Sequence, residues 1–372
     1  MRISVISNSY PHPRFPQSGS FVYNLTDAWA KSGDHVDVYA LCSRTHFLSK
    51  RQRKRTKLDL NPSINIQYIR YVSFGRKKFF GMDSAEVGFT LSHAALRSAF
   101  QKNFHVDSEE FNLYGKFLLS GGRHAAKLSQ IYRCKAFADL GESRLIAGFS
   151  QRELDNAKWI VQSLKGVVCV SPRLEHEALE LGMDQSKVLM SPNVPNTDIF
   201  YPLDAQFCRY KLGLPVNKKI VIFVGHFIHR KGPDRVLAAV ESLSDDFNCI
   251  FIGDGPISLY SQRILAMAQV RNSDLNFWLN AADVFCLPTF AEGSCNAINE
   301  ARVVGLPIVT SNIEDITNSP FSSDYICVNP SSVPEIAEAI EYASSLGRIQ
   351  YPGTPVGMKE RAEGIRAWMM GL

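Results

Sequence analysis

Two glutamates in a turn-and-helix segment carry the most suggestive chemistry in this sequence. Residues 291–301 read AEGSCNAINEA, and they follow an apolar run that ends at Leu287. If that run is a strand of a parallel sheet, the segment lies at the carboxyl edge, where α/β proteins bind ligands. Glu292 would then lie in the loop, and Glu300 would lie one to two turns into the following helix. Both carboxylates could accept hydrogen bonds from the hydroxyl groups of one ligand.

The turn between the two glutamates has the composition of an anion site. Ser294, Cys295 and Asn296 would open the helix, so that their backbone amides and the helix dipole face a negative group such as a diphosphate. A capped helix with a surface glutamate at each end gives the same pattern without any ligand. This segment alone does not decide between a binding site and an ordinary helix start.

A second segment supplies positive charge after another apolar run. Residues 224–232 read VGHFIHRKG, in which Gly225 and Gly232 bracket a tight loop and Arg230 and Lys231 precede an expected helix. Charge-assisted hydrogen bonds to a phosphate are one use of such a pair. An exposed basic turn is the other interpretation.

The elements that would position these segments alternate along the C-terminal half. We expect strands at 220–224, 249–252, 284–287 and 308–310, and helices from Pro233, from about Ile257, and at 296–304 and 335–346. A third glycine segment, residues 253–256 (GDGP), follows one of these strands. There Gly253 would let a ligand approach the backbone, although the same residues also make an ordinary turn.

The N-terminal half repeats this alternation less regularly. We expect strands at 3–7, 36–40 and 166–170, and helices at 21–32, 94–101, 123–132, 151–164 and 172–181. Strands that alternate with helices predict parallel sheets with right-handed crossovers. Two prolines exclude regular structure from residues 191–196, so we place a linker between two domains there.

Length and composition limit the class of protein. A chain of 372 residues is long for one core, which favours two domains. The eight cysteines are scattered without a C-x-x-C pair, so we expect neither a disulfide framework nor a zinc site. The N-terminal apolar run is too short for a signal peptide, and no apolar stretch approaches the roughly 20 residues that span a bilayer. We therefore expect a soluble, cytoplasmic protein.

Positive charge is concentrated between Arg44 and Lys78. This stretch contains eleven basic residues and one acid, Asp59, although the whole chain carries a net charge of only +5. A solvated face is one interpretation. Contact with anionic lipid head groups is the other, at about 1 kcal/mol for each basic side chain, and phenylalanines in the same stretch favour it over nucleic acid. We therefore expect residues 44–78 to contact an anionic membrane surface, with the protein peripheral on its inner face.

Taken in order, these segments resemble the retaining glycosyltransferases of glycosyltransferase family 4. Glu292 and Glu300 match that family's Glu-x7-Glu motif, and residues 253–256 match its Gly-Asp-Gly-Pro segment. Residues 282–288 (ADVFCLP) match its Ala-Asp-x4-Pro segment, and residues 192–200 match Pro-Asn-x3-Thr-x2-Phe. The resemblance spans most of residues 1–345 and is specific in the C-terminal half.

The resemblance implies a fold and a donor. The fold would be GT-B: a Rossmann-like acceptor domain at 1–194, a Rossmann-like nucleotide-sugar domain at 195–350, and a C-terminal helix at 351–372 that returns to the N-terminal domain. The two parallel sheets would face each other across a cleft. The donor would be a nucleotide-diphospho-sugar, with no metal and no other cofactor.

The resemblance also implies roles for individual residues. Glu300 would bind the ribose hydroxyls, Glu292 a hydroxyl of the donor sugar, and Lys231 the diphosphate together with the amides near Ser294. Gly19 would let the first loop approach the donor phosphate. The reaction would be a displacement with retention, driven by charge stabilisation on the leaving diphosphate.

Two positions depart from the family pattern. The arginine that follows the strand glycine is His226 here, so that Arg230 would have to supply the charge or His226 a hydrogen bond. The family's His-Gly-x-Asp segment reads LGES at residues 140–143, where Glu142 either binds sugar hydroxyls or is an ordinary turn residue. The region 255–279 is also shorter than usual.

We therefore expect a hexosyltransferase that acts on a saccharide or lipid-linked acceptor in cell-surface polysaccharide or lipopolysaccharide synthesis. A catalytically impaired member that binds nucleotide within a glycan-assembly complex is the alternative, because of His226 and Leu140. A dinucleotide oxidoreductase is disfavoured, since no Gly-x-Gly-x-x-Gly follows the first strand.

Overall fold

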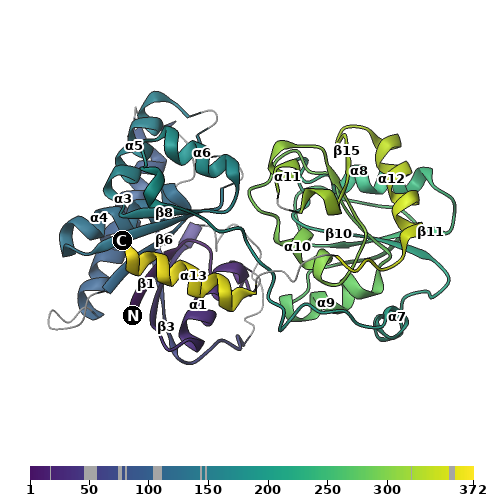
Figure 1. The fold of residues 1–372 in the computed structure, drawn as a ribbon, viewed down its shortest axis with the longest axis horizontal. Coiled ribbons are helices and arrows are strands. Elements are labelled where there is room, and N and C mark those ends of the chain that lie inside the picture. The colour runs from purple at the N-terminus through teal and green to yellow at the C-terminus, as the bar shows by residue number, and fades with distance from the viewer. Residues whose placement is uncertain are drawn as a thin grey trace. The chain divides into compact units, whose positions relative to one another are not determined.

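The computed structural model divides into two compact units (Figure 1). The N-terminal unit contains residues 1–170, 174–191 and 359–372, and the C-terminal unit contains 171–173 and 192–358. The structure describes all residues except 17, 46–56, 74–77, 80–81, 104–110, 143–144, 147–148, 320 and 352–356. No helix in the described part of the chain is long and apolar enough to cross a bilayer.

The N-terminal unit is built on a seven-stranded parallel sheet in the order β3-β2-β1-β6-β7-β8-β9. Its strands are β1 (Arg2–Ser7), β2 (His35–Ser43), β3 (Ile64–Tyr71), β6 (Phe111–Lys116), β7 (Lys135–Leu140), β8 (Gly166–Cys169) and β9 (Val188–Met190). A short antiparallel pair joins β4 (Lys78–Phe79) and β5 (Met82–Asp83). The inner strands read as near-continuous buried runs, as expected for a sheet covered on both faces.

The helices of the N-terminal unit follow the sheet strand by strand. They are α1 (Ser20–Lys31), α3 (Ser84–Asn103), the π-helix η1 (Phe117–Gly122), α4 (Arg123–Tyr132), α5 (Gln151–Ser163), α6 (Pro172–Glu180), the short 3-10 helix η2 (Gln185–Lys187) and α13 (Met358–Gly371). The expected helix at 94–101 is therefore part of a longer one, and η1 was not expected at all.

The C-terminal helix α13 packs on the N-terminal unit (Figure 1). The indole Nε1 of Trp29, which is fully buried, donates to Ala362 O at 2.8 Å, and Arg366 pairs with Asp34 at 2.9 Å. Ala362, together with other buried residues of the helix, faces the unit's core. Residues 359–372 therefore belong to the same compact unit as residues 1–170.

The C-terminal unit is built on a six-stranded parallel sheet in the order β12-β11-β10-β13-β14-β15. Its strands are β10 (Lys219–Val224), β11 (Phe247–Ile252), β12 (Ile264–Ala268), β13 (Val284–Leu287), β14 (Ile308–Ser311) and β15 (Ile326–Val328). Its helices are α7 (Ala205–Leu212), α8 (Pro233–Ser242), α9 (Asn272–Ala281), α10 (Asn296–Val303), α11 (Glu314–Thr317), the 3-10 helix η3 (Ser322–Asp324) and α12 (Val333–Leu346).

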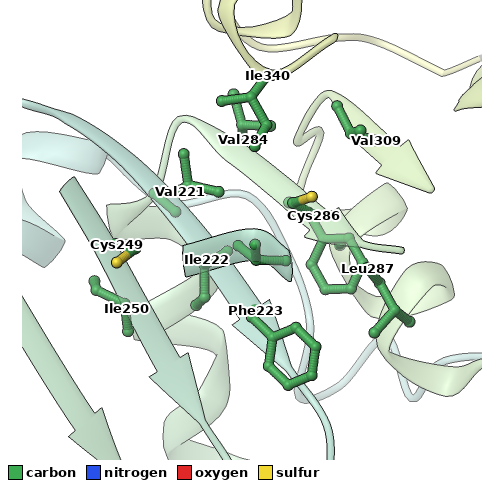
Figure 2. Packing of buried hydrophobic residues seen from close by; sticks show 14 of the residues in the cluster. Val221, Ile222, Phe223, Cys249, Ile250, Val284, Cys286, Leu287, Val309 and Ile340 are labelled. Atoms are coloured by element: carbon green, nitrogen blue, oxygen red, sulfur yellow. The ribbon is translucent and has the colours of Figure 1, made fainter. Parts of the chain in front are cut away.

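The core of the C-terminal unit lies on its three central strands (Figure 2). Ile222 and Phe223 of β10, Ile250 of β11 and Val284 of β13 are fully buried, and Ile340 of α12 packs beside Val284. These apolar runs explain why the sequence predicts the strands well. The two parallel α/β sheets confirm the expected fold class.

The prediction of a helix from about Ile257 is wrong. Residues 253–263 form an irregular connection, and β12 follows it as an edge strand parallel to β11. This connection must run back along a strand of six residues, a distance of about 20 Å. A helix within so few residues would advance only about 1.5 Å per residue, so the chain has to remain extended.

Candidate functional site

The loops after β10 and β11 are joined through their backbones. Gly225 N donates to Ile252 O at 2.9 Å, and Phe227 N donates to Asp254 O at 2.7 Å. A Cβ on Gly253, whose φ is 147°, would lie 1.9 Å from Gly225 O. The close approach that makes a glycine necessary at 253 is therefore made by the neighbouring loop of the chain itself.

His226 faces the same neighbouring loop. Its Nδ1 contacts Asp254 O and lies 3.4 Å from the Asp254 carboxylate, while about half of the side chain is exposed. In this position the imidazole ties the β10 loop to the Gly-Asp-Gly-Pro loop.

The three residues predicted to carry the chemistry lie together. Lys231 Nζ forms an ion pair with Glu292 Oε1, and Arg230 Nη1 lies 3.7 Å from the same oxygen while it donates to Ala291 O. Glu292 is only 6% exposed. One carboxylate thus faces two cations, which leaves the cluster with a net positive charge that suits a diphosphate.

A buried arginine that the sequence analysis missed holds this cluster in place. Arg235 donates to His229 O at 3.0 Å and to Pro288 O at 2.7 Å, and its guanidinium lies over the Phe290 ring at 4.2 Å. Burial lowers the pKa of Arg235 from its ordinary value. Gly232 leaves room for it, because a Cβ there would lie 2.4 Å from Arg235 Nη2. An arginine one turn into a helix gives no sequence signal of such a role.

The turn before α10 is fixed by the segment that enters the C-terminal unit. Asn193 N donates to Ser294 Oγ and Asn193 Nδ2 donates to Ser294 O, both at 3.2 Å, while Asn299 Nδ2 donates to Asn193 O at 2.9 Å. The side chain of Ser294 is therefore engaged. Within the described part of the chain, no side-chain hydrogen bond caps the N-terminus of α10, which begins at Asn296 after Cys295. Such an uncapped helix start suits an anion.

Glu300 differs from the other acidic residues of the site. It lies in α10 and is 9% exposed, and burial raises the pKa of its carboxyl to about 8. No hydrogen bond or ion pair engages this carboxyl within the described part of the chain. Buried polar groups are normally satisfied, so Glu300 has the character of a group that binds a ligand.

In the N-terminal unit, Gly19 has a structural reason to be glycine. It caps α1 with φ 68°, and a Cβ would lie 2.2 Å from Ser9 O. Leu140, which replaces the histidine of the family pattern, is fully buried in the core. Glu142 accepts hydrogen bonds from Leu118 N at 2.6 Å and Gly141 N at 3.0 Å, and burial raises the pKa of its carboxyl to about 7.

The sequence analysis also missed a buried ion cluster at the ends of β6 and β7. Lys116 Nζ pairs with Asp139 Oδ1 at 2.5 Å, and Arg361 of α13 lies 3.6 Å from Asp139 Oδ2. Tyr114 donates to the same carboxylate at 3.1 Å. The available signal was that β6 ends in Lys116 and that Asp139 directly precedes the last residue of β7.

Seven of the eleven basic residues of the stretch 44–78 lie outside the described residues, which omit 46–56 and 74–77. The expectation of contact with an anionic membrane surface therefore stays a prediction. The same holds for the separate roles assigned to the site residues, whose positions alone are described above.

Comparisons with known proteins define the class. Residues 218–345 match the family model described as "Glycosyl transferases group 1". Sucrose-phosphate synthase from Thermosynechococcus elongatus is similar in fold, with a TM-score of 0.71, 18% identity and coverage of 100% of this chain and 94% of that one. HepE from Anabaena, solved with UDP and glucose, gives a TM-score of 0.67 at 14% identity and covers both chains fully. The chain is a glycosyltransferase with the GT-B fold.

A curated relative makes the comparison more particular. The chain is 26% identical over 361 residues to the putative teichuronic acid biosynthesis glycosyltransferase TuaC of Bacillus subtilis, covering 91% of this chain and 88% of TuaC. This similarity extends through both units. The regions that the sequence analysis matched only loosely therefore also have a counterpart in a glycosyltransferase.

Proposed function

We propose that this glycosyltransferase moves a hexose from a nucleotide-diphospho-sugar to a saccharide or lipid-linked acceptor. The transfer retains the anomeric configuration, as in glycosyltransferase family 4, and uses no catalytic metal. The acceptor belongs to cell-surface polysaccharide or lipopolysaccharide synthesis. The similarity to TuaC, which is described as a teichuronic acid biosynthesis glycosyltransferase, supports this proposal.

The observation that carries the proposal is the buried, unengaged carboxyl of Glu300 beside an uncapped helix start. Ribose hydroxyls would donate to this carboxyl, and the hydrogen bonds would favour its ionised form. Glu300 is four residues beyond Asn296, about 6 Å along the helix. That spacing suits a nucleotide whose ribose lies beside the helix and whose diphosphate lies at its N-terminus.

Lys231 and Arg230 supply the second half of the mechanism. Their charges lie at the carboxyl edge of the sheet next to Glu292. As the bond to the sugar breaks, negative charge grows on the leaving diphosphate, and fixed cations in a partly buried site stabilise it most. Glu292 keeps the two cations in place and offers Oε2 to a hydroxyl of the donor sugar.

The test is a calorimetric and hydrolysis screen of UDP-, GDP- and ADP-sugars. We expect micromolar binding of one nucleotide class and slow donor hydrolysis that persists in EDTA. The UDP complexes of HepE make UDP-sugars the first to test. Binding without hydrolysis or transfer would instead identify the impaired nucleotide-binding partner. No binding by any class would contradict the proposal.

A further inference from the structure

A residue with a strained backbone lies at the carboxyl edge of the sheet in the N-terminal unit. Two non-glycine residues have positive φ in the described part of the chain: Phe117 at 64° and Arg133 at 52°. Arg133 follows the last turn of α4, where left-handed residues are common. Phe117 instead is the first residue of η1, directly after β6, and a bulky residue adopts this conformation only when its surroundings impose it.

Those surroundings are tightly built. The carboxyl of Glu142 accepts the N–H of Leu118, the residue after Phe117, and the N–H of Gly141. A Cβ on Gly121 would lie 2.3 Å from Ile6 O, so the η1 backbone rests directly on β1. A π-helix is rare and often marks a functional site.

The left-handed backbone of Phe117 places its aromatic ring at the carboxyl edge of the sheet. The ring centroids of Phe117 and Phe21 lie 6.1 Å apart at an interplanar angle of 66°. The ammonium of Lys116 lies 5.3 Å from the first centroid and 5.2 Å from the second. Lys116 is buried and paired with Asp139, whereas both rings are half-buried.

This edge suits a neutral ring rather than a charged ligand. The two cations described at this edge, Lys116 and Arg361, are each 4% exposed and lie against Asp139, so the half-buried rings of Phe117 and Phe21 are the more exposed groups. A pyranose has an apolar face of C–H groups that packs on such rings, with hydroxyls around its rim for polar partners. Ordinary core packing of Phe117 would need no left-handed backbone.

We propose that Phe117 and Phe21 form a platform for the sugar ring of the acceptor, with Glu142 as the positioning residue that holds Phe117 in place. This inference rests on the proposed function, because it assigns the acceptor to the N-terminal unit. It also explains why Glu142 spends its carboxyl on two backbone amides instead of pointing at a ligand.

The experiment compares Phe117→Gly with Arg133→Gly in the full chain. Glycine relieves the backbone strain at both positions, but Phe117→Gly also removes a half-buried ring, so circular dichroism and the melting temperature are used to confirm that both variants are folded. Binding is measured by saturation-transfer NMR and titration with octyl glucoside, galactoside, mannoside and N-acetylglucosaminide. We expect Phe117→Gly to lower the affinity for the tightest-binding pyranoside by about tenfold or more. Arg133→Gly and Phe117→Tyr should bind it with the affinity of the wild type.

Two further variants complete the test. Phe21→Ala should lower the affinity for the same pyranoside. Glu142→Gln should do so too, because an NH2 group replaces one of the two oxygens that accept the N–H groups of Leu118 and Gly141. In the glutamine variant, an unchanged circular dichroism spectrum would show that the loss of binding is local and not a general loss of structure. Equal pyranoside binding by wild type and Phe117→Gly, or none by the wild type, would overturn the platform.

The outcomes also separate this inference from the proposed function. If the wild type binds nucleotide but Phe117→Gly binds pyranosides as tightly as the wild type, the platform proposal fails and the transferase proposal stands. If pyranosides bind through Phe117 but no nucleotide binds, the proposed donor chemistry fails and the platform stands.

Discussion

The two units place charged groups at the carboxyl edge of a parallel sheet, but they bury them to different degrees. In the C-terminal unit, Arg230 and Lys231 share one carboxylate and are partly exposed, and no described residue engages the carboxyl of Glu300. In the N-terminal unit, Lys116 and Arg361 also share one carboxylate, Asp139, but each is only 4% exposed, and the ammonium of Lys116 lies over two aromatic rings. One edge therefore suits a charged, hydroxyl-bearing ligand and the other a neutral ring.

The largest effect should come from removing charge at the C-terminal edge. Lys231→Ala should lower turnover by about 10²–10³-fold, because the lost cation acts on charge that develops in the transition state. The melting temperature should change little, since Arg230 still faces Glu292. Lys219→Ala is the matched control, an exposed lysine of β10 that donates to Ser344 O. If Lys231→Ala turns over like this control, Lys231 is only a surface residue.

The N-terminal edge depends on α13, which supplies Arg361 to its ion cluster. Met369 is 1% exposed and Met370 is 61% exposed, so neighbouring residues of one type form a pair of probes. Met369→Ala should lower the free energy of unfolding by about 2–4 kcal/mol, and Met370→Ala should change it by less than about 0.5 kcal/mol. Denaturant titration measures both. Similar values for the two would mean that the helix does not pack as described.

Two glycines test whether the first loop is constrained by the chain itself. Both have positive φ, but a Cβ on Gly19 would strike Ser9 O, whereas a Cβ on Gly33 meets nothing within 4 Å. Gly33→Ala should cost about 1 kcal/mol of unfolding free energy, and Gly19→Ala should cost clearly more. Equal costs in denaturant titration would leave Gly19 without a structural reason and favour direct contact with the donor.

The smallest predicted effect is the pH dependence of Glu300. Burial raises its pKa from 4.5 to about 8, so the folded state holds a proton that the unfolded chain releases. The resulting loss of stability is absent below the unfolded pKa and grows as the pH rises towards 8. Glu300→Gln should therefore gain about 3 °C or more in melting temperature over the wild type between about pH 5 and pH 8.5. Glu338→Gln, an exposed control, should show a constant difference.

The sequence predicted the C-terminal edge because its signals are local. Apolar runs at 220–224 and 284–287 became β10 and β13, and the helix expected at 296–304 became α10. The cluster of Lys231, Glu292 and Arg230 follows from loops after adjacent strands. Their chemical roles remain predictions.

The N-terminal edge was less predictable because long-range contacts create it. The π-helix η1 exists where Gly121 meets the backbone of β1, and no local pattern in the sequence encodes that meeting. Lys116 and Asp139 become partners only through the pairing of β6 with β7. The helix expected from about Ile257 failed for a related reason, since the span that the connection must cover decides its conformation.

The central claim is that Glu300 binds the nucleotide of the donor, and isothermal calorimetry of Glu300→Ala tests it most directly. UDP, GDP and ADP are titrated into the wild type, Glu300→Ala and the exposed control Glu338→Ala. Glu300→Ala should lower the affinity for the preferred nucleotide by about tenfold or more, because hydrogen bonds to a charged group are lost, and the other two proteins should keep it. Equal affinity in all three proteins would contradict the account.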